Sequence, residues 1–277
     1  MQRFALFCLA FSVVAPAVAA PGWSAFRAPT AHTSESVGGY ARGCLLGGVA
    51  LPERGPGFET IRRFRHRFFG HPQLARYLSD FGRRLAERGL PAALIGDLSQ
   101  PRGGPMPSGH RSHQIGLDVD VWFTKPMGDL RTDEAFASLV DERHEKIDHA
   151  VFRPTHVEML RLAVEDPSVA RVFVGWVIKR ELCKTVKGDR RWLGKIRPWW
   201  GHTRHFHVRL ACPEGSPECR DQAPPPVGDG CGEESWFSRA EAAKRKKAPK
   251  KGHHAPPPSP PLPARCAALL QADAAAK

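Results

Sequence analysis

The sequence predicts an α+β fold in which a small antiparallel sheet carries the functional residues and is flanked by helices and stabilised by disulfides. Two segments separated by about ninety residues alternate polar and apolar side chains, as strands with one buried face do. Other segments place apolar residues at helical spacing. The six cysteines that follow residue 20 form an even set, which is typical of an exported, disulfide-stabilised domain.

Residues 1–19 have the pattern of a secretory signal peptide. Arg3 precedes an apolar run over residues 4–14, and an A-x-A cleavage site ends at Ala19. The apolar run is too short to span a bilayer. We therefore expect cleavage after Ala19, export, and no membrane-spanning segment. A lipoprotein signal is disfavoured, because Cys8 lies inside the apolar run rather than after it.

The elements that follow are predicted from hydrophobic periodicity. Three segments have the apolar spacing of helices, at residues 58–69, 73–88 and 154–165. Two short runs of apolar or β-branched residues predict buried strands, at residues 92–96 and 169–174. The Gly/Pro-rich residues 101–109 predict a loop that leads into the first of the two alternating segments.

That first alternating segment, residues 117–121, places Asp118 and Asp120 on one face of a strand. Gly116 lets the backbone turn just before the strand, so His113 on the incoming loop can fold toward the carboxylates. The second alternating segment, residues 203–210, places its histidines and one arginine on one face.

If the two strands are neighbours in one sheet, His113, Asp120 and His207 converge. Two histidines and a carboxylate that leave a fourth position open for water are the ligand set of a catalytic zinc site. A solvated polar sheet face is the alternative, since polar side chains are usually exposed. It is disfavoured for the two segments taken together, because histidines and acids are concentrated in both.

Hydrolysis by metal-bound water also needs a group that takes a proton and hands it to the leaving amine, and histidine is suited to that near neutral pH. His205 is the candidate, with His202 as the alternative. Both could instead support the metal ligands or lie at the surface.

These segments resemble the penicillin-insensitive murein endopeptidases of the LAS group of metallopeptidases. The resemblance rests on several strings that occur in the family's order, namely Ser112-His113-Gln114, Gly116-Leu117-Asp118-Val119-Asp120, Arg197-Pro198-Trp199, His205-Phe206-His207-Val208-Arg209-Leu210 and Gly228-Asp229-Gly230-Cys231-Gly232. It implies a periplasmic enzyme with Zn²⁺ as cofactor that hydrolyses the D-alanyl to meso-diaminopimelyl cross-links of peptidoglycan. Insensitivity to penicillin agrees with the absence of S-x-x-K and G-x-S-x-G motifs, because no acyl-serine forms for the drug to trap.

The resemblance also implies the disulfide pairing, which spacing alone does not determine: Cys44–Cys266, Cys183–Cys231 and Cys212–Cys219. It further implies a second metal on His110, Asp141 and His144, although Asp148 or His149 could substitute there. A charged, solvated turn explains the segment from Asp141 to His144 equally well.

We expect one metallopeptidase domain over residues 20–238, because each half of the site is incomplete alone. Residues 239–277 are rich in Lys, Pro and Ala, which predicts an extended tail held at its end by Cys266. The formal charge of +13 could indicate nucleic acid. An exported chain without a nucleic-acid motif fits the anionic cell wall better.

Two other classes of function stay open. Two histidines and a carboxylate also form the facial triad of non-haem iron enzymes, and metal analysis would separate the two. A non-catalytic protein that binds metal and cell wall would bind sacculi but release no peptide. The sequence does not decide the oligomeric state, and a homodimer is one of the alternatives.

Overall fold

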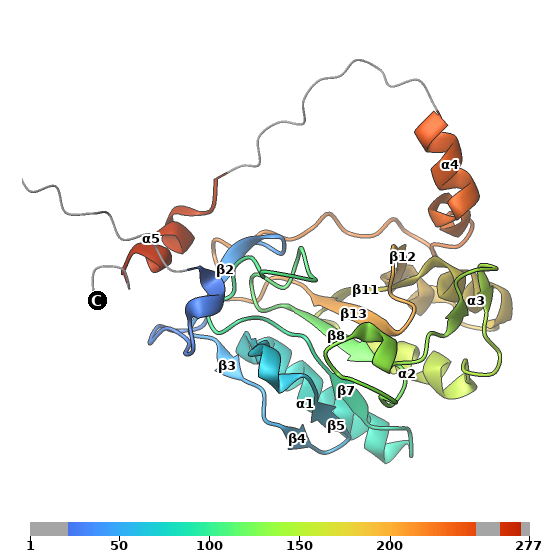
Figure 1. Ribbon diagram of the computed structural model, residues 1–277, viewed down its shortest axis with the longest axis horizontal. Coiled ribbons are helices and arrows are strands. Elements are labelled where there is room, and N and C mark those ends of the chain that lie inside the picture. Colours follow the sequence, from blue (N-terminus) through green and yellow to red (C-terminus); the bar gives the residue numbers. More distant parts are fainter. Residues whose placement is uncertain (1–21, 248–260, 273–277) are drawn as a thin grey trace, which may run out of the picture.

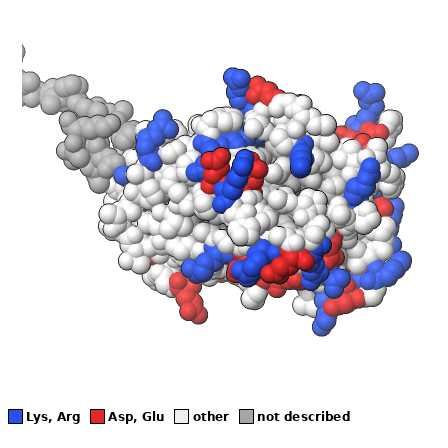
Figure 2. Space-filling model, turned by 90° about the horizontal axis from the view of Figure 1, so that it is seen from below, with Lys and Arg blue, Asp and Glu red and all other residues white. Residues whose placement is uncertain are grey.

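The computed structural model describes residues 22–247 and 261–272. The expected signal peptide at residues 1–19 lies outside the described residues. None of the helices in these two ranges is long and apolar enough to cross a membrane. On the face of the molecule shown in Figure 2, basic and acidic side chains are interspersed, so the positive charge is not gathered into one patch there.

The central element is a seven-stranded mixed sheet with the strand order β12-β11-β13-β8-β7-β5-β4 (Figure 1). Its strands are β4 (Arg54–Gly55), β5 (Phe58–Thr60), β7 (Ala93–Ile95), β8 (Asp118–Trp122), β11 (Val169–Gly175), β12 (Ile196–Trp199) and β13 (His205–Leu210). Three smaller sheets pair β1 (Glu35–Gly39) with β2 (Arg42–Leu46), β3 (Val49–Ala50) with β6 (Phe69–Gly70), and β9 (Val140–Asp141) with β10 (Lys146–Ile147).

The described α-helices are α1 (Pro72–Glu87), α2 (Pro154–Glu165), α3 (Trp176–Thr185), α4 (Arg239–Lys247) and α5 (Ala264–Ala272). Short 3-10 helices lie at Trp23–Ala25 (η1), Arg63–Arg65 (η2), Asp133–Ala135 (η3), Arg191–Lys195 (η4) and Glu234–Phe237 (η5). The predictions of a helix at residues 154–165 and of strands at 92–96 and 169–174 are confirmed, and the helix predicted at 73–88 is α1.

The α+β class is confirmed, but the prediction of a small antiparallel sheet is wrong. Strands β8 and β13 are antiparallel, as are β11 with β13 and β7 with β8. Toward the edges, however, β5 pairs with β7 and β11 with β12 in parallel. Parallel neighbours need a long crossover connection. Here α1 lies in the connection from β5 to β7, and α3 in the connection from β11 to β12.

The helix predicted at residues 58–69 is also wrong. Phe58 and Thr60 are buried while Glu59 between them is partly exposed, which is the period of a strand, and β5 pairs with β4 and β7. Farther on, Arg62 and His66 both have a φ of 56°, in the left-handed region. Two such residues interrupt a right-handed helix. Pairing with neighbouring strands therefore overrides the apolar spacing of this segment.

The two faces of the central sheet have different environments. Phe206 of β13 packs on the helical side, where its ring lies 6.5 Å from Phe81 of α1. Helix α1 is joined to α2 by a hydrogen bond of 3.0 Å from Tyr77 Oη to the carbonyl of Ala163. The apolar residues of β8 and β13 thus form the core with these helices. The opposite face of the same strands carries the polar residues of the candidate site.

The C-terminal segment returns to the N-terminal strands. Leu269 of α5 and the Cys266 bridge pack in a small core with Trp23 and Phe26. The expected extended tail is wrong for residues 239–247, which form α4. Ala, Glu, Lys and Arg are strong helix formers, and Ser238 Oγ accepts a hydrogen bond from the Glu241 amide at 3.2 Å, as an N-cap does.

Three disulfides join the pairs that the resemblance implies: Cys44–Cys266, Cys183–Cys231 and Cys212–Cys219. The first joins residues 222 positions apart and therefore links the two ends of the described chain.

Replacing Cys44 and Cys266 together by alanine should destabilise the protein more than replacing Cys212 and Cys219 together. The sequence separations are 222 and 7 residues. A bridge that closes the longer loop removes more entropy from the unfolded chain, by roughly 3 kcal/mol in the chain-entropy relation. Urea denaturation of the two double variants measures the difference. Equal losses of stability would show that local packing, and not loop length, determines the contribution of each bridge.

Candidate metal centre

Strand pairing builds the polar face of the site. In the antiparallel pair of β8 and β13, His205 lies opposite Trp122, His207 opposite Asp120 and Arg209 opposite Asp118. Residues directly opposite each other in such a pair have side chains on the same face. The two alternating segments of the sequence are therefore neighbours, in the register that brings both sets of polar residues together.

Asp118 is the residue that orients the histidines. Its Oδ1 contacts His207 Nε2 at 2.9 Å, and its Oδ2 accepts a hydrogen bond from the His113 backbone amide at 2.9 Å. Arg209 donates two hydrogen bonds to the same carboxylate, at 2.8 and 3.1 Å. Burial opposes ionisation of Asp118, but the charges of Arg209 and His207 hold its pKa well below the usual value. An ionised Asp118 makes Nε2 of His207 the protonated nitrogen.

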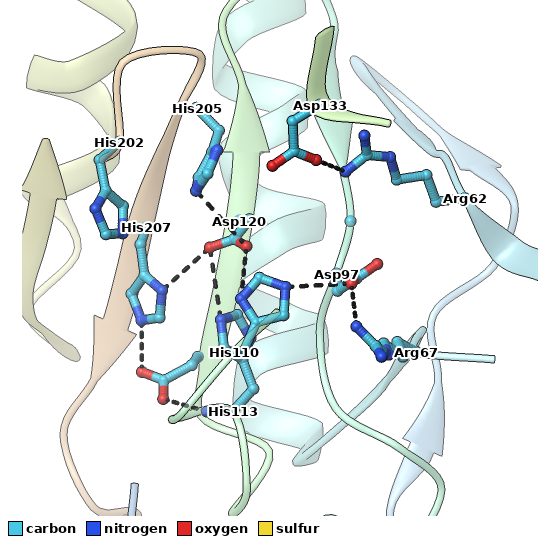
Figure 3. Close-up of polar contacts among 12 residues, drawn as sticks. Arg62, Arg67, Asp97, His110, His113, Asp120, Asp133, His202, His205 and His207 are labelled. Atoms are coloured by element: carbon cyan, nitrogen blue, oxygen red, sulfur yellow. Dashed lines mark hydrogen bonds and ion pairs between the residues drawn. The ribbon is translucent and has the colours of Figure 1, made fainter. Parts of the chain in front are cut away.

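Four imidazoles surround the carboxylate of Asp120, which is almost completely buried (Figure 3). Its Oδ1 lies 3.1 Å from His207 Nδ1 and 3.5 Å from His113 Nε2. Its Oδ2 lies 3.4 Å from His110 Nδ1 and 3.8 Å from His205 Nε2. Burial opposes ionisation of Asp120, yet the surrounding histidines lower its pKa well below the usual value.

The donor set fits a metal ion. Both ring nitrogens of His113 and Oδ1 of Asp120 are buried and have no hydrogen-bond partner. Buried polar atoms are nearly always satisfied, so such atoms call for a partner. In addition, a neutral His207 with its proton on Nε2 directs the lone pair of Nδ1 at an ionised oxygen, and two acceptors at 3.1 Å need a cation between them. Nitrogen and oxygen donors of this kind suit Zn²⁺.

A proton can serve as that cation when no metal is bound. Burial disfavours the charged form of His207, but Asp118 and Asp120 outweigh burial and raise the pKa of His207. The same arrangement thus attracts either a proton or a metal ion.

His205 and His202 lie beside this cluster. Burial lowers the pKa of His205, against the opposing charge of Asp120. Burial, together with the neighbouring His205 and His207, lowers the pKa of His202 to about 3. Nδ1 of His202 lies 2.7 Å from the carbonyl of Trp200 and donates to it. Both rings are therefore neutral near pH 7.

The three residues predicted to bind a second metal lie in two different places. His110 lies between Asp120 and Asp97, with its Nε2 3.2 Å from Asp97 Oδ2. One ligand atom of His110, one of His113 and one of Asp120 lie within 4.8 Å of one another. Asp141, the last residue of β9, contacts His144 of the following turn at 2.6 Å. Across the described ranges, no hydrogen bond or ion pair joins this turn to His110.

Sequence reasoning did not assign roles to Asp97, Asp118 and Arg209. Asp118 and Arg209 could have been found from their places on the same strand faces as Asp120 and His207. For Asp97 the available signal was weaker, namely an acid directly after the apolar run that forms β7.

A family model and several known proteins that match this chain all carry the same description. A family model described as penicillin-insensitive murein endopeptidase matches residues 36–271. A penicillin-insensitive murein endopeptidase of Haemophilus influenzae is 46% identical over 209 residues, which cover 73% of this chain and 72% of the relative. Proteins of the same name from Klebsiella pneumoniae and Yersinia enterocolitica are each 38% identical and cover 98% of both chains. The chain therefore belongs to the penicillin-insensitive murein endopeptidase family.

Proposed function

We propose that this protein is an exported zinc endopeptidase that hydrolyses the D-alanyl to meso-diaminopimelyl cross-links of murein. The names of its relatives support the substrate. The observation that supports metal chemistry is the buried carboxylate of Asp120, which faces imidazole nitrogens and has an oxygen without a hydrogen-bond partner. The signal-peptide pattern and the three disulfides support a periplasmic location.

His113, Asp120 and His207 are the proposed ligands, and Nδ1 of His110 lies within reach of the same carboxylate. Zinc at this place would lower the pKa of water and polarise the scissile carbonyl. A second metal on His110, Asp141 and His144 remains a proposal, which metal stoichiometry in a His144→Ala variant tests.

His205 is the proposed proton-transfer group. Its Nε2 lies 3.8 Å from Asp120, so it is next to the proposed ligands, and its lowered pKa leaves a neutral ring that can accept a proton at pH 7. The ring is packed against Trp122 at a centroid distance of 4.8 Å, which holds its orientation. His202 is the alternative, although one of its nitrogens is already bound to the Trp200 carbonyl.

The proposal is tested by digesting purified sacculi and identifying the products by mass spectrometry. Monomeric muropeptides with a free amine on diaminopimelic acid should appear, and chelation of the metal should stop their release. Zinc should restore activity and benzylpenicillin should leave it unchanged. Binding to sacculi without product release would support the non-catalytic alternative, and restoration by iron with a 2-oxoacid, but not by zinc, would support an iron enzyme.

Alanine at His113, Asp120 or His207 should each remove metal and activity and leave a folded protein, because the ligands are carried by a sheet that helices and disulfides stabilise. Metal content by mass spectrometry and folding by circular dichroism are the measurements. His32→Ala, at an exposed histidine of the same chain, is the matched control and should keep its metal. Full zinc occupancy in any of the three variants would exclude that residue as a ligand.

His205→Ala should keep zinc and lower kcat by about 10²- to 10⁴-fold, the usual scale of general acid-base catalysis. KM should change little, since the loss falls on the transition state. Steady-state kinetics on a dimeric muropeptide, combined with metal analysis, give the answer. Near-normal turnover would transfer the role to His202, while loss of zinc would make His205 a ligand.

A further inference from the structure

A cavity of about 620 Å³ opens beside Asp120, and the metal chemistry proposed above does not use most of its wall. Asp120 and His205 line one part of it, and Trp122 lies beside them. Four arginines, Arg62, Arg65, Arg67 and Arg131, also line the cavity, together with one further acid, Asp133. In Figure 3, Arg62 and Arg67 lie on the side of Asp120 opposite His202 and His207.

Arg65 and Arg67 give this wall an excess of positive charge. Nη1 of each contacts the same oxygen, Oδ2 of Asp97, at 3.2 and 2.9 Å. One buried carboxylate therefore pairs with two guanidinium groups, and its single negative charge balances only one of their two positive charges. The other two arginines have acids of their own: Arg62 pairs with Asp133 at 2.8 Å, and Arg131 pairs with Asp129 at 3.1 Å.

The guanidinium groups of Arg65 and Arg67 are held in place by hydrogen bonds, and each has further N–H donors that these bonds do not use. Besides Asp97, Arg65 donates to the carbonyl of Arg131 at 2.9 Å and Arg67 donates to Ser108 Oγ at 3.2 Å. Within the described residues, each group thus makes two hydrogen bonds, whereas a guanidinium has five N–H donors. The side chain of Arg65 is 21% exposed, so it is the more accessible of the two. Fixed guanidinium groups of this kind bind carboxylates with two parallel hydrogen bonds.

The proposed substrate has a carboxylate at the matching place. In the cross-link, the nitrogen of the scissile amide is bonded to a carbon of diaminopimelic acid that also bears a carboxylate. That carboxylate carbon is two bonds from the nitrogen, about 2.5 Å away by standard bond lengths. A cross-link whose carbonyl lies at Asp120 and His205 must therefore place an anion close to the metal centre, and the same cavity contains the arginines.

We propose that the cavity wall formed by Arg65 and Arg67 binds the free carboxylate next to the scissile nitrogen, on the leaving-group side of the murein cross-link. This inference rests on the proposed function and specifies which part of the substrate the protein recognises. It makes Arg65 a specificity-determining residue that contacts substrate but not the reacting carbonyl.

The test compares paired substrates on the zinc-loaded protein. One dimeric muropeptide carries the free carboxylate beside the scissile amide, a second has this group as a carboxamide, and a third has only the C-terminal D-alanine carboxylate amidated. The wild type should prefer the first over the second by about 10- to 100-fold in kcat/KM, the scale of a charged hydrogen-bonded contact. The third should be cleaved like the first.

Arg65→Gln should lose most of this preference and keep its zinc, and Arg65→Lys should keep part of it because the charge remains. Arg54→Gln is the matched control, since Arg54 is 73% exposed on β4 at the far edge of the sheet. It should discriminate like the wild type. An unchanged preference in Arg65→Gln, or discrimination only against the third substrate, would overturn the assignment of this carboxylate.

Binding of the cleavage product separates failure of this inference from failure of the proposed function. The monomeric product, with a free amine beside either the carboxylate or the carboxamide, cannot be cleaved again at this bond. Titration calorimetry should show tighter binding of the carboxylate form to the wild type but not to Arg65→Gln. Such binding without any cleavage of dimers would support the carboxylate site and contradict the peptidase. Cleavage of dimers with equal binding of both products would support the peptidase and contradict the carboxylate site.

Discussion

The buried carboxylate of Asp118 is the contact on which the site depends. It joins a strand, a loop and the neighbouring strand, because it binds Arg209, the backbone amide of His113 and the ring of His207. A buried anion is unfavourable unless it is paired and hydrogen-bonded, and the two-pronged contact with Arg209 meets that requirement. The consequence for the site is directional, since Nδ1 of His207 is turned toward Asp120.

A second carboxylate acts in the same way on the other side of Asp120. Asp97 contacts Nε2 of His110 and so leaves Nδ1 facing Asp120, as Asp118 does for His207. Acids that bind the outer nitrogen of a histidine fix its orientation and raise its basicity toward a metal. Asp97 also anchors Arg65 and Arg67, so one side chain links the proposed metal centre with the proposed carboxylate site.

The fold was predictable where local pattern and tertiary structure agree. The sequence of residues 154–165 fits only a helix and that of residues 169–174 only a strand, and both elements are found. Residues 58–69 have apolar spacing that fits a helix, but β5 gains pairing on both sides and Arg62 turns into the left-handed region. The parallel edges of the sheet could not be read from any single segment, because crossover direction depends on how distant segments pack.

The sequence alone determined the chemistry that the site can hold. Alternation placed Asp120 and His207 on strand faces, and His113 followed from the turn before the first strand. Only the tertiary structure decided that these faces meet, since a shift of one residue in the pairing of β8 and β13 would turn every side chain to the opposite face. It alone also placed His110 with this cluster and brought Arg65 and Arg67 to Asp97. The contacts of Arg65 and Arg67 with Asp97 join residues 32 and 30 positions apart, and their partners are chosen by burial and charge, which no local pattern records.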